Sequence, residues 1–594
     1  MKEKKLMSMI KSQVNPLYRW ARANVCKAIT LVALGFLTTV PLTWAAEGDH
    51  VPSGTGTPSA IRGPRVDVGP GRPVVLDDIP QATPAELALH PAPVRPRDGL
   101  TDEQHRARKL QAEIMSRGMG TGLSNRSGPS LKQTVSPPFP FATASFAGLN
   151  QEFACPDCTP PDMALAVSEN FVVQVVNTAI TVLDKRGNVQ PGYPKSINSF
   201  FGLSSTAFTT DPRIFYDWAN HRFLMVMLLE SDLGGSDNVG SLLIAVTQTH
   251  DPRRGWFTYS PAFQIGNTGE CPDFPTLGHD ATNWGAGVTE GGFYVGINQF
   301  DTPCVSLINN FLFLIPKDPV YVGSGFGFTI WHGFTDGPLV DTLQPANITG
   351  RGDKLQEVLF VNSFNINFGG GQCSGGCNGL IVWGIANPFS GGGFTAKVIS
   401  TVNNYSLPPL AHEPGCTSSG CIDTNDTRIS GQVKYNAGSI FGSLETAAAG
   451  EAHPIWFEIR PQTDVNGNIN GATELQEDCF FCGGFVKNGS AYFATLQPDP
   501  ENNVTMVYNY SEDDQFPGTA YTSRKSDYCC LMNGSGFFIR GGDAFYGEGR
   551  WGDYTATAVD NTLANSPSVW FAGMFAESDG DWGTWIGANQ PSTP

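Results

Sequence analysis

Five aspartates recur beside Pro, Phe, Trp or Tyr at the edges of apolar runs. They stand in the segments PPD, DPR, YDW, DFP and GDY, and they are Asp162, Asp211, Asp217, Asp273 and Asp553. Carboxylates that gather at one point can act as an acid–base pair or hold a cation. We take Asp162, Asp217, Asp273 and Asp553 as candidate catalytic residues. The alternative is structural, because an Asp side chain often closes a turn through nearby backbone amides.

A second segment has the spacing of a calcium-binding loop. In NGNINGATELQE (466–477) oxygen-bearing side chains alternate up to a Gly, and a Glu stands at the twelfth position. Such spacing wraps oxygen ligands around one ion. The first position holds Asn where Asp is expected, so an Asn/Gly-rich hairpin turn is the alternative. The predicted ligands are Asp464, Asn466, Asn468, Asn470, Glu474 and Glu477.

Other catalytic motifs are missing from the sequence. It contains no G-x-S-x-G nucleophile elbow, no H-E-x-x-H zinc motif and no phosphate-binding loop. Asp579–Trp585 (DGDWGTW) is similar to the Asp-box turn of sialidase-type propellers, one residue short, but that turn is structural. Calcium is therefore the one cofactor that the sequence suggests.

The cysteines indicate a disulfide-bonded protein from an oxidising compartment. One of the 13 lies near the amino terminus, and most of the others form close couples, as local disulfides do. The CPDC and CFFC couples could instead supply four thiolates to zinc. Cys529 and Cys530 pair either with each other or with Cys479 and Cys482. The predicted disulfide cysteines are Cys155, Cys158, Cys271, Cys304, Cys373, Cys377, Cys416, Cys421, Cys479, Cys482, Cys529 and Cys530.

Composition and pattern predict an all-β protein. The chain has 594 residues, with 15% charged, 68 Gly, 43 Pro and 38 Phe, which suits short strands and tight turns. From residue 141 on, groups of three or four short apolar runs begin near residues 160, 207, 275, 342, 428, 484 and 549. Recurrence of this kind indicates a β-propeller of seven blades, with six or eight as alternatives. Two or three β-sandwiches are the competing architecture.

The amino-terminal part divides into two segments before this domain, 141–594. Residues 1–46 combine a basic stretch with the apolar run Ala28–Trp44, which is typical of a signal peptide; an uncleaved anchor is the alternative. Residues 47–140 are rich in Pro and Gly, and we expect a disordered tail or spacer with one short solvated helix over Thr101–Ser116. No span is expected in the mature chain.

The charge balance limits the choice of partners. Residues 141–594 contain 19 basic and 44 acidic residues. Such a surface repels nucleic acid and anionic lipid, and it keeps an exported protein soluble. We therefore expect no nucleic-acid partner.

Four segments carry a family resemblance. PPDMALAVSENFVVQVVNTAITVLDKRG (Pro160–Gly187), DPRIFYDWANHRFLMVML (Asp211–Leu228), DFPTLGHD (Asp273–Asp280) and RWGDYTATAVD (Arg550–Asp560) resemble a group of uncharacterised exported bacterial proteins. That group is thought to be propeller-like and has no established activity. The resemblance therefore implies a fold and export, and it carries over no catalytic residue.

Two functions are consistent with these observations. The first is a secreted or cell-surface propeller that binds or scaffolds carbohydrate or another envelope component, since aromatic residues are abundant. The second is a secreted polysaccharide hydrolase or lyase with carboxylates at the centre of the propeller. Convergence of the aspartates in an open central pocket would favour the enzyme.

Overall fold

The computed structural model describes residues 57–88, 102–123 and 141–591, except 157, 233–239, 268, 286, 290, 302–303, 305, 350–352, 365–376, 417–419, 481–487, 527–531, 533–535 and 563–566. Strands dominate these residues, so the expected all-β class is confirmed. The predicted signal peptide, 1–46, lies outside them. None of the helices in the described ranges is long and apolar enough to cross a membrane.

The domain consists of successive antiparallel groups of strands, and the first strand of each group lies near one of the predicted starting points. These first strands are β4 (Met163–Val167), β8 (Ala207–Asp217), β12 (Cys271–His279), β16 (Gln344–Pro345) with β17 (Asn347–Ile348), β21 (Lys434–Asn436), β25 (Ser490–Pro498) and β29 (Ala556–Asp560). The strands that follow them are β5 (Phe171–Val176), β6 (Ala179–Asp184), β7 (Lys195–Ser196), β9 (Arg222–Asp232), β10 (Ser241–Thr247), β11 (Gly255–Gln264), β13 (Gly292–Phe300), β14 (Leu307–Pro316), β15 (Phe326–Thr335), β18 (Glu357–Ser363), β19 (Cys377–Ala386), β20 (Phe394–Tyr405), β22 (Ser439–Ala448), β23 (Glu451–Thr463), β24 (Ile469–Cys479), β26 (Val504–Glu512), β27 (Gln515–Arg524), β28 (Phe537–Arg540), β30 (Ser568–Ala576) and β31 (Trp582–Asn589). Short helices lie between some of them: α4 (Gln151–Ala154), α5 (Ile197–Phe201) and α6 (Lys317–Tyr321).

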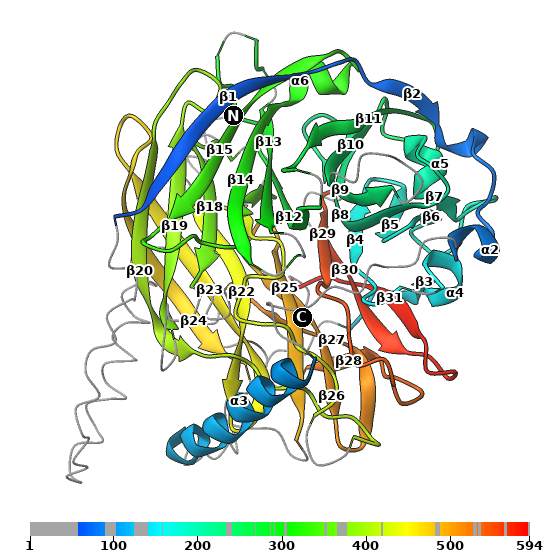
Figure 1. Cartoon of the computed structure of the whole chain (residues 1–594), viewed down its shortest axis with the longest axis vertical. Helices are drawn as coiled ribbons and strands as arrows, with labels where there is room; N and C mark the ends of the chain where they lie inside the picture. Colours follow the sequence, from blue (N-terminus) through cyan, green and yellow to red (C-terminus); the bar gives the residue numbers. More distant parts are fainter. Residues whose placement is uncertain are drawn as a thin grey trace, which may run out of the picture.

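The innermost strands contact one another in a closed cycle. Strand β4 contacts β8, β8 contacts β12, and the cycle continues through β17, β21, β25 and β29 back to β4. Strand β3 (Ala144–Asn150) pairs with the last strand, β31, so both ends of the domain share one sheet. Strand β17 also joins the β12 and β21 groups into one ten-stranded sheet through parallel pairs. The fold is thus propeller-like, with its sheets arranged around a common axis (Figure 1).

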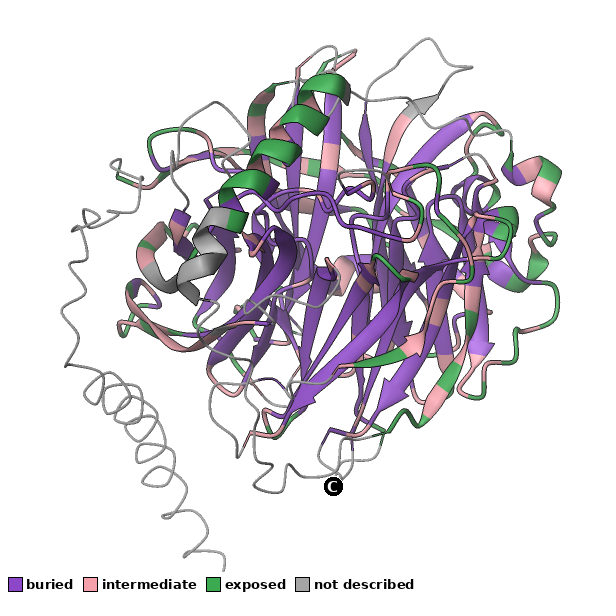
Figure 2. Cartoon of the chain, turned by 90° about the horizontal axis from the view of Figure 1, so that it is seen from below, coloured by how far each residue is buried: buried purple, intermediate pink, exposed green. Residues whose placement is uncertain are grey.

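The core lies between neighbouring sheets. Strand β10 is buried along its whole length, and its alternate residues enter two different clusters. Leu242 and Ile244 pack with Phe313 of the next group, whereas Leu243 and Ala245 pack with apolar side chains of the preceding group. Because a strand turns successive side chains to opposite faces, a continuous apolar run such as LLIAV (242–246) suits a sheet that is covered on both sides. Figure 2 shows the same burial across most strands.

Part of the amino-terminal segment is ordered against the domain, so the expectation of a disordered tail over 47–140 is wrong for those residues. Strand β1 (Ser59–Val68) pairs with β15, and β2 (Arg72–Val75) pairs with β11 (Figure 1). The short helices η1 (Leu76–Asp78) and α2 (Pro84–Leu87) follow. The outer strands of two sheets otherwise expose unpaired backbone groups, and the tail supplies their partners. Backbone pairing of this kind does not require aromatic side chains, so a segment that contains few of them can still be ordered.

The predicted helix also differs from the expectation. Helix α3 spans Asp102–Leu123 and contacts β22 and β23. Its outer face is exposed (Figure 2), but Lys109, Glu113 and Ser116 are buried. The helix is therefore docked, because polar side chains along one of its faces find partners on the domain.

Candidate functional site

Three of the four predicted catalytic aspartates lie together where the innermost strands begin, and we call this the acidic end of the axis. Asp162 stands just before β4, Asp273 lies in β12 and Asp553 precedes β29. Asp211 of β8 joins them, since its charge and that of Asp553 both act on Asp162. Backbone geometry helps to aim Asp211, because it has a φ of +54° in an irregular part of the β8–β9 pairing.

The buried carboxyls of Asp162 and Asp211 hydrogen-bond to each other. Asp162 Oδ1 also accepts from the backbone amide of Asp553 at 3.2 Å, and Asp211 Oδ2 accepts from that of Phe274 at 3.1 Å. Burial, followed by the neighbouring carboxylates, raises the pKa of Asp162 well above its usual range and the pKa of Asp211 to about 7. Two adjacent buried carboxyls with raised pKa values can act as a proton donor and a proton acceptor.

Arginines surround this pair. Arg550 forms an ion pair with Asp553 at 2.7 Å. Arg213 donates through Nε to the carbonyl of Pro275 at 2.7 Å, and its guanidinium lies 3.4 Å from the centroid of the Tyr554 ring. The sequence analysis did not single out either arginine, although each stands within three residues of an aspartate of the acidic end.

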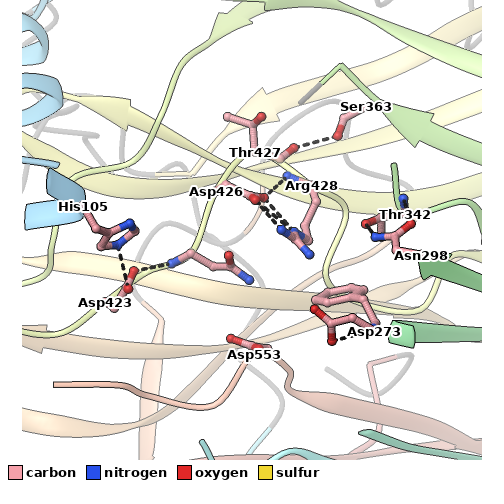
Figure 3. Close-up of polar contacts among 12 residues, drawn as sticks. His105, Asp273, Asn298, Thr342, Ser363, Asp423, Asp426, Thr427, Arg428 and Asp553 are labelled. Atoms are coloured by element: carbon pink, nitrogen blue, oxygen red, sulfur yellow. Dashed lines mark hydrogen bonds and ion pairs between the residues drawn. The ribbon is translucent and has the colours of Figure 1, made fainter. Parts of the chain in front are cut away.

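A third arginine approaches from the segment before β21. Arg428 forms an ion pair with Asp426 at 2.6 Å, and its guanidinium lies 4.7 Å from the centroid of the Phe274 ring. Figure 3 shows Arg428 pointing toward Asp273, with Asp553 on the other side of the same space. The acidic end is therefore a cluster of alternating charges.

Helix α3 holds the segment that delivers Arg428. His105 forms an ion pair with Asp423 at 2.9 Å (Figure 3). Lys109 is fully buried and donates to the carbonyls of Pro408 and Asn425 and to the Thr424 hydroxyl. These contacts fix the chain on either side of Asp423.

The acidic pair is closed off from the solvent by its neighbours. Asp162 and Asp211 are 2% and 4% exposed, and Tyr554 is fully buried. Two cavities follow along the axis, one of about 10 Å³ beside Arg213 and one of about 30 Å³ farther on. Each has room for no more than one or two waters. The two carboxyls of the pair thus lie beneath the surface formed by the described residues.

The fourth predicted residue, Asp217, does not join the cluster. It ends β8 at the opposite end of the axis, which we call the basic end, where Lys317 Nζ lies 2.6 Å from its Oδ2. The Tyr321 hydroxyl donates to the same oxygen at 2.8 Å. Although burial opposes ionisation, the Lys317 ammonium holds the pKa of Asp217 well below its usual range. Asp217 is thus a structural ion-pair partner.

His279 and Lys434 complete the basic end. His279 Nδ1 accepts from Lys317 at 3.2 Å, and its ring stacks on Phe215 with centroids 3.8 Å apart. Burial and the Lys317 charge lower the pKa of His279 well below its usual range. Lys434 is also buried, and burial followed by the charge of Arg213 lowers its pKa to about 7. No motif around either residue singles it out in the sequence.

The predicted calcium loop is wrong, and the hairpin alternative holds. Asp464 Oδ1 accepts from the backbone amides of Asn466 and Asn468, which closes the turn between β23 and β24. Asn470, Glu474 and Glu477 then lie along the extended strand β24. At about 3.3 Å per residue, the last of these stands about 23 Å beyond the first, so the six side chains do not surround one ion.

The described cysteines form disulfides. Cys155 bonds to Cys158, Cys271 to Cys304 and Cys416 to Cys421, as predicted. Cys377 and Cys479 are disulfide-bonded as well. Three of the four thiols of the alternative zinc site, those of Cys155, Cys158 and Cys479, are therefore in disulfides. The predictions for Cys373, Cys482, Cys529 and Cys530 lie outside the described residues.

A larger recess lies on the outside of the ring, between β1, β15 and the turn after β19. Its volume is about 1000 Å³ including the part open to solvent, or about 460 Å³ of room for water. The floor contains the buried rings of Phe326 and Phe328, and the partly exposed ring of Phe389 lies at one side. Arg65 and Asp67 of β1 line the rim and form an exposed ion pair at 3.2 Å.

The chain is similar to several solved structures at low sequence identity. No protein-family model matches it, and no curated protein matches it. A protein of unknown function from Dyadobacter fermentans is 12% identical over 65% of this chain and 95% of that one, with a TM-score of 0.30. An endo-arabinase from Bacteroides thetaiotaomicron is 11% identical over 66% and 100%, with a TM-score of 0.30. A Trypanosoma rangeli sialidase in complex with sialic acid is 9% identical over 69% and 57%, with a TM-score of 0.31. The function has to be argued from the chain itself.

Proposed function

We propose that the protein is an exported seven-bladed β-propeller that binds carbohydrate of the cell envelope. The count of seven is supported by the seven antiparallel groups, by the cycle of contacts among their first strands and by the β3–β31 pairing. Disulfides such as Cys155–Cys158, Cys271–Cys304 and Cys416–Cys421 support an extracellular location.

The outer recess carries the proposal, because it is much larger than either described cavity along the axis. Its volume is in the range of small-ligand sites. Arg65 and Asp67 stand two residues apart on β1, so their side chains share one face of the strand. Their planar polar groups can hydrogen-bond adjacent hydroxyls of a sugar, while the Phe389 ring offers an apolar contact for the face of the sugar ring.

A glycan-array screen of the mature chain, followed by calorimetry on the best ligand, tests this function. Arg65→Ala and Asp67→Asn should each weaken binding at least tenfold, because each removes a charged hydrogen-bonding group. Arg62→Ala is the matched control, since Arg62 is exposed on the same strand and does not line the recess. Unchanged affinity in both recess variants, or no glycan bound at all, would reject the proposal.

A second candidate function is cleavage of a polysaccharide at the acidic end, by a hydrolase or a lyase reaction. The buried pair Asp162–Asp211 beside Arg550 favours it, because carboxyls with raised pKa values can donate and accept protons near neutral pH. A turnover screen on neutral and acidic polysaccharides tests it. Turnover that disappears in Asp211→Asn but survives in Arg65→Ala would establish the enzyme, whereas no turnover of any substrate would reject it.

A further inference from the structure

The larger axial cavity, at the basic end, is lined by groups that favour a negative charge. Its volume is about 30 Å³, and its walls include residues from the innermost strand of every group. Polar side chains among them are His279, Asn347, Gln432, Lys434 and Gln497. No Asp or Glu is among the described residues that line it.

Lys434 is the charged group of this cavity, and it has no carboxylate partner there. It is 1% exposed, and its Nζ donates to Gln432 Oε1 at 2.8 Å and to the Thr557 carbonyl at 3.4 Å. Asp217, a buried acid of the basic end, is already paired with Lys317. A buried ammonium without a counter-ion is costly, so it either loses its proton or acquires an anion.

The neighbours of Lys434 add donors. Lys317 donates to His279 Nδ1, so the proton of the neutral imidazole resides on Nε2, and this ring also lines the cavity. Gln432 accepts from Lys434 through Oε1, which leaves its amide group to donate. Gln497 is the exception, because its Oε1 is a buried acceptor without a partner. A water that bridges Lys434 and Gln497 is therefore the competing occupant.

We propose that the axial cavity binds one small monovalent anion of halide size, held by Lys434 Nζ with donors from His279 and Gln432. The room of about 30 Å³ suits a monatomic ion. The bound charge neutralises the ammonium and joins the innermost strands β12 and β21 at the centre of the ring. This site is independent of the proposed glycan recess, which lies on the outside.

Anion binding at this site depends on pH. Burial lowers the pKa of Lys434 to about 7, so the ion-free site takes up a proton when it binds the anion at higher pH. The charged and titratable groups that face Lys434 are Arg213 of β8 and His279 of β12, with the Lys317–Asp217 pair behind His279. Affinity should fall about tenfold for each pH unit above 7, because one proton is linked to binding.

Thermal melts and a crystal structure in bromide test the site. The mature chain is dialysed into gluconate and titrated with NaBr at constant ionic strength, at pH 6, 7, 8 and 9. We expect a saturable rise of the melting temperature with bromide that weakens above pH 7, and an anomalous bromide peak beside Lys434 Nζ. Lys434→Met should abolish both, whereas Lys354→Met, a change of an exposed lysine, should retain both.

Two results would overturn the proposal. Wild-type crystals grown in bromide without an anomalous peak in the cavity would show that water occupies it. A rise in melting temperature that persists in Lys434→Met would show that the halide acts elsewhere. If Lys434→Met does not fold, the wild-type anomalous map decides alone.

Discussion

The two ends of the ring axis bury the same kind of side chain and give it opposite ionisation. Asp211 and Asp217 lie on one strand, β8, and both are almost completely buried. Burial, reinforced by neighbouring carboxylates, raises the pKa of Asp211 to about 7. Asp217 has the Lys317 ammonium 2.6 Å away, and its pKa falls well below the usual range. The partner, more than burial, decides the charge of an aspartate here.

Breaking the ion pair at the basic end should have the largest effect. Asp217→Asn or Lys317→Met leaves one buried charge without its partner, and each should lower the free energy of unfolding by about 3–5 kcal/mol. Urea unfolding at pH 7 measures this change. The double variant Asp217→Asn/Lys317→Met should lose less free energy of unfolding than the two single variants together, because it contains no unpaired buried charge. Strictly additive losses would show that the pair does not couple.

Removing the anchor of α3 should have the next largest effect, at the acidic end. Lys109→Met leaves the carbonyls of Pro408 and Asn425 without their donor, and should cost about 1–3 kcal/mol of unfolding free energy. Limited proteolysis should then cut within α3 faster than in the wild type. Ile114→Ala is the control, because Ile114 is 61% exposed on the same helix. Equal cleavage of both variants would contradict a docked helix.

The Asp211 carboxyl should impose a pH dependence on stability. The native state keeps this proton up to about pH 7, whereas the unfolded chain releases it near pH 4, so the native state binds more protons in between. The free energy of unfolding therefore decreases as pH rises through that window. Asp211→Asn has no such decrease, and its stability relative to the wild type should improve between pH 4.5 and 7.5 on the order of 1–3 kcal/mol.

Urea unfolding of Asp211→Asn and wild type at both pH values makes the measurement. Asp67→Asn serves as a control, since that exposed aspartate should leave the pH slope unchanged. A relative stability of Asp211→Asn that is constant with pH would show that Asp211 is already ionised at pH 4.5.

His279 should give a smaller effect of the opposite sign. Its pKa is lowered in the native state, so below about pH 6.5 the unfolded chain binds a proton that the native state does not. The free energy of unfolding therefore falls as pH decreases. His279→Gln keeps an acceptor for Lys317 and should remove about 1 kcal/mol of that loss between pH 6.5 and 5.5. The acid limb of the urea-unfolding profile measures it, and an unchanged limb would mean that His279 titrates normally.

Local features could be predicted from single segments. The first strands of the groups lie near the starting points expected from the apolar runs, and the couples Cys155–Cys158 and Cys416–Cys421 formed disulfides. The calcium-loop prediction was wrong, because its six residues lie in a turn and along strand β24 and do not surround one point. A loop and a strand can carry the same alternation of oxygens, and only the pairing of β24 with β23 extends the chain there.

The order of the strands, the starting points of their groups and the close disulfides were determined by the sequence itself, because turn residues and alternating apolar residues act within a few positions. Only the tertiary structure decided which aspartates meet. Asp211 and Asp217 are six residues apart, about 20 Å along an extended strand, and so they reach opposite ends of the axis. Their partners Asp162 and Lys317 come from other groups of the ring, and no local pattern encodes a contact that the closure of the ring creates.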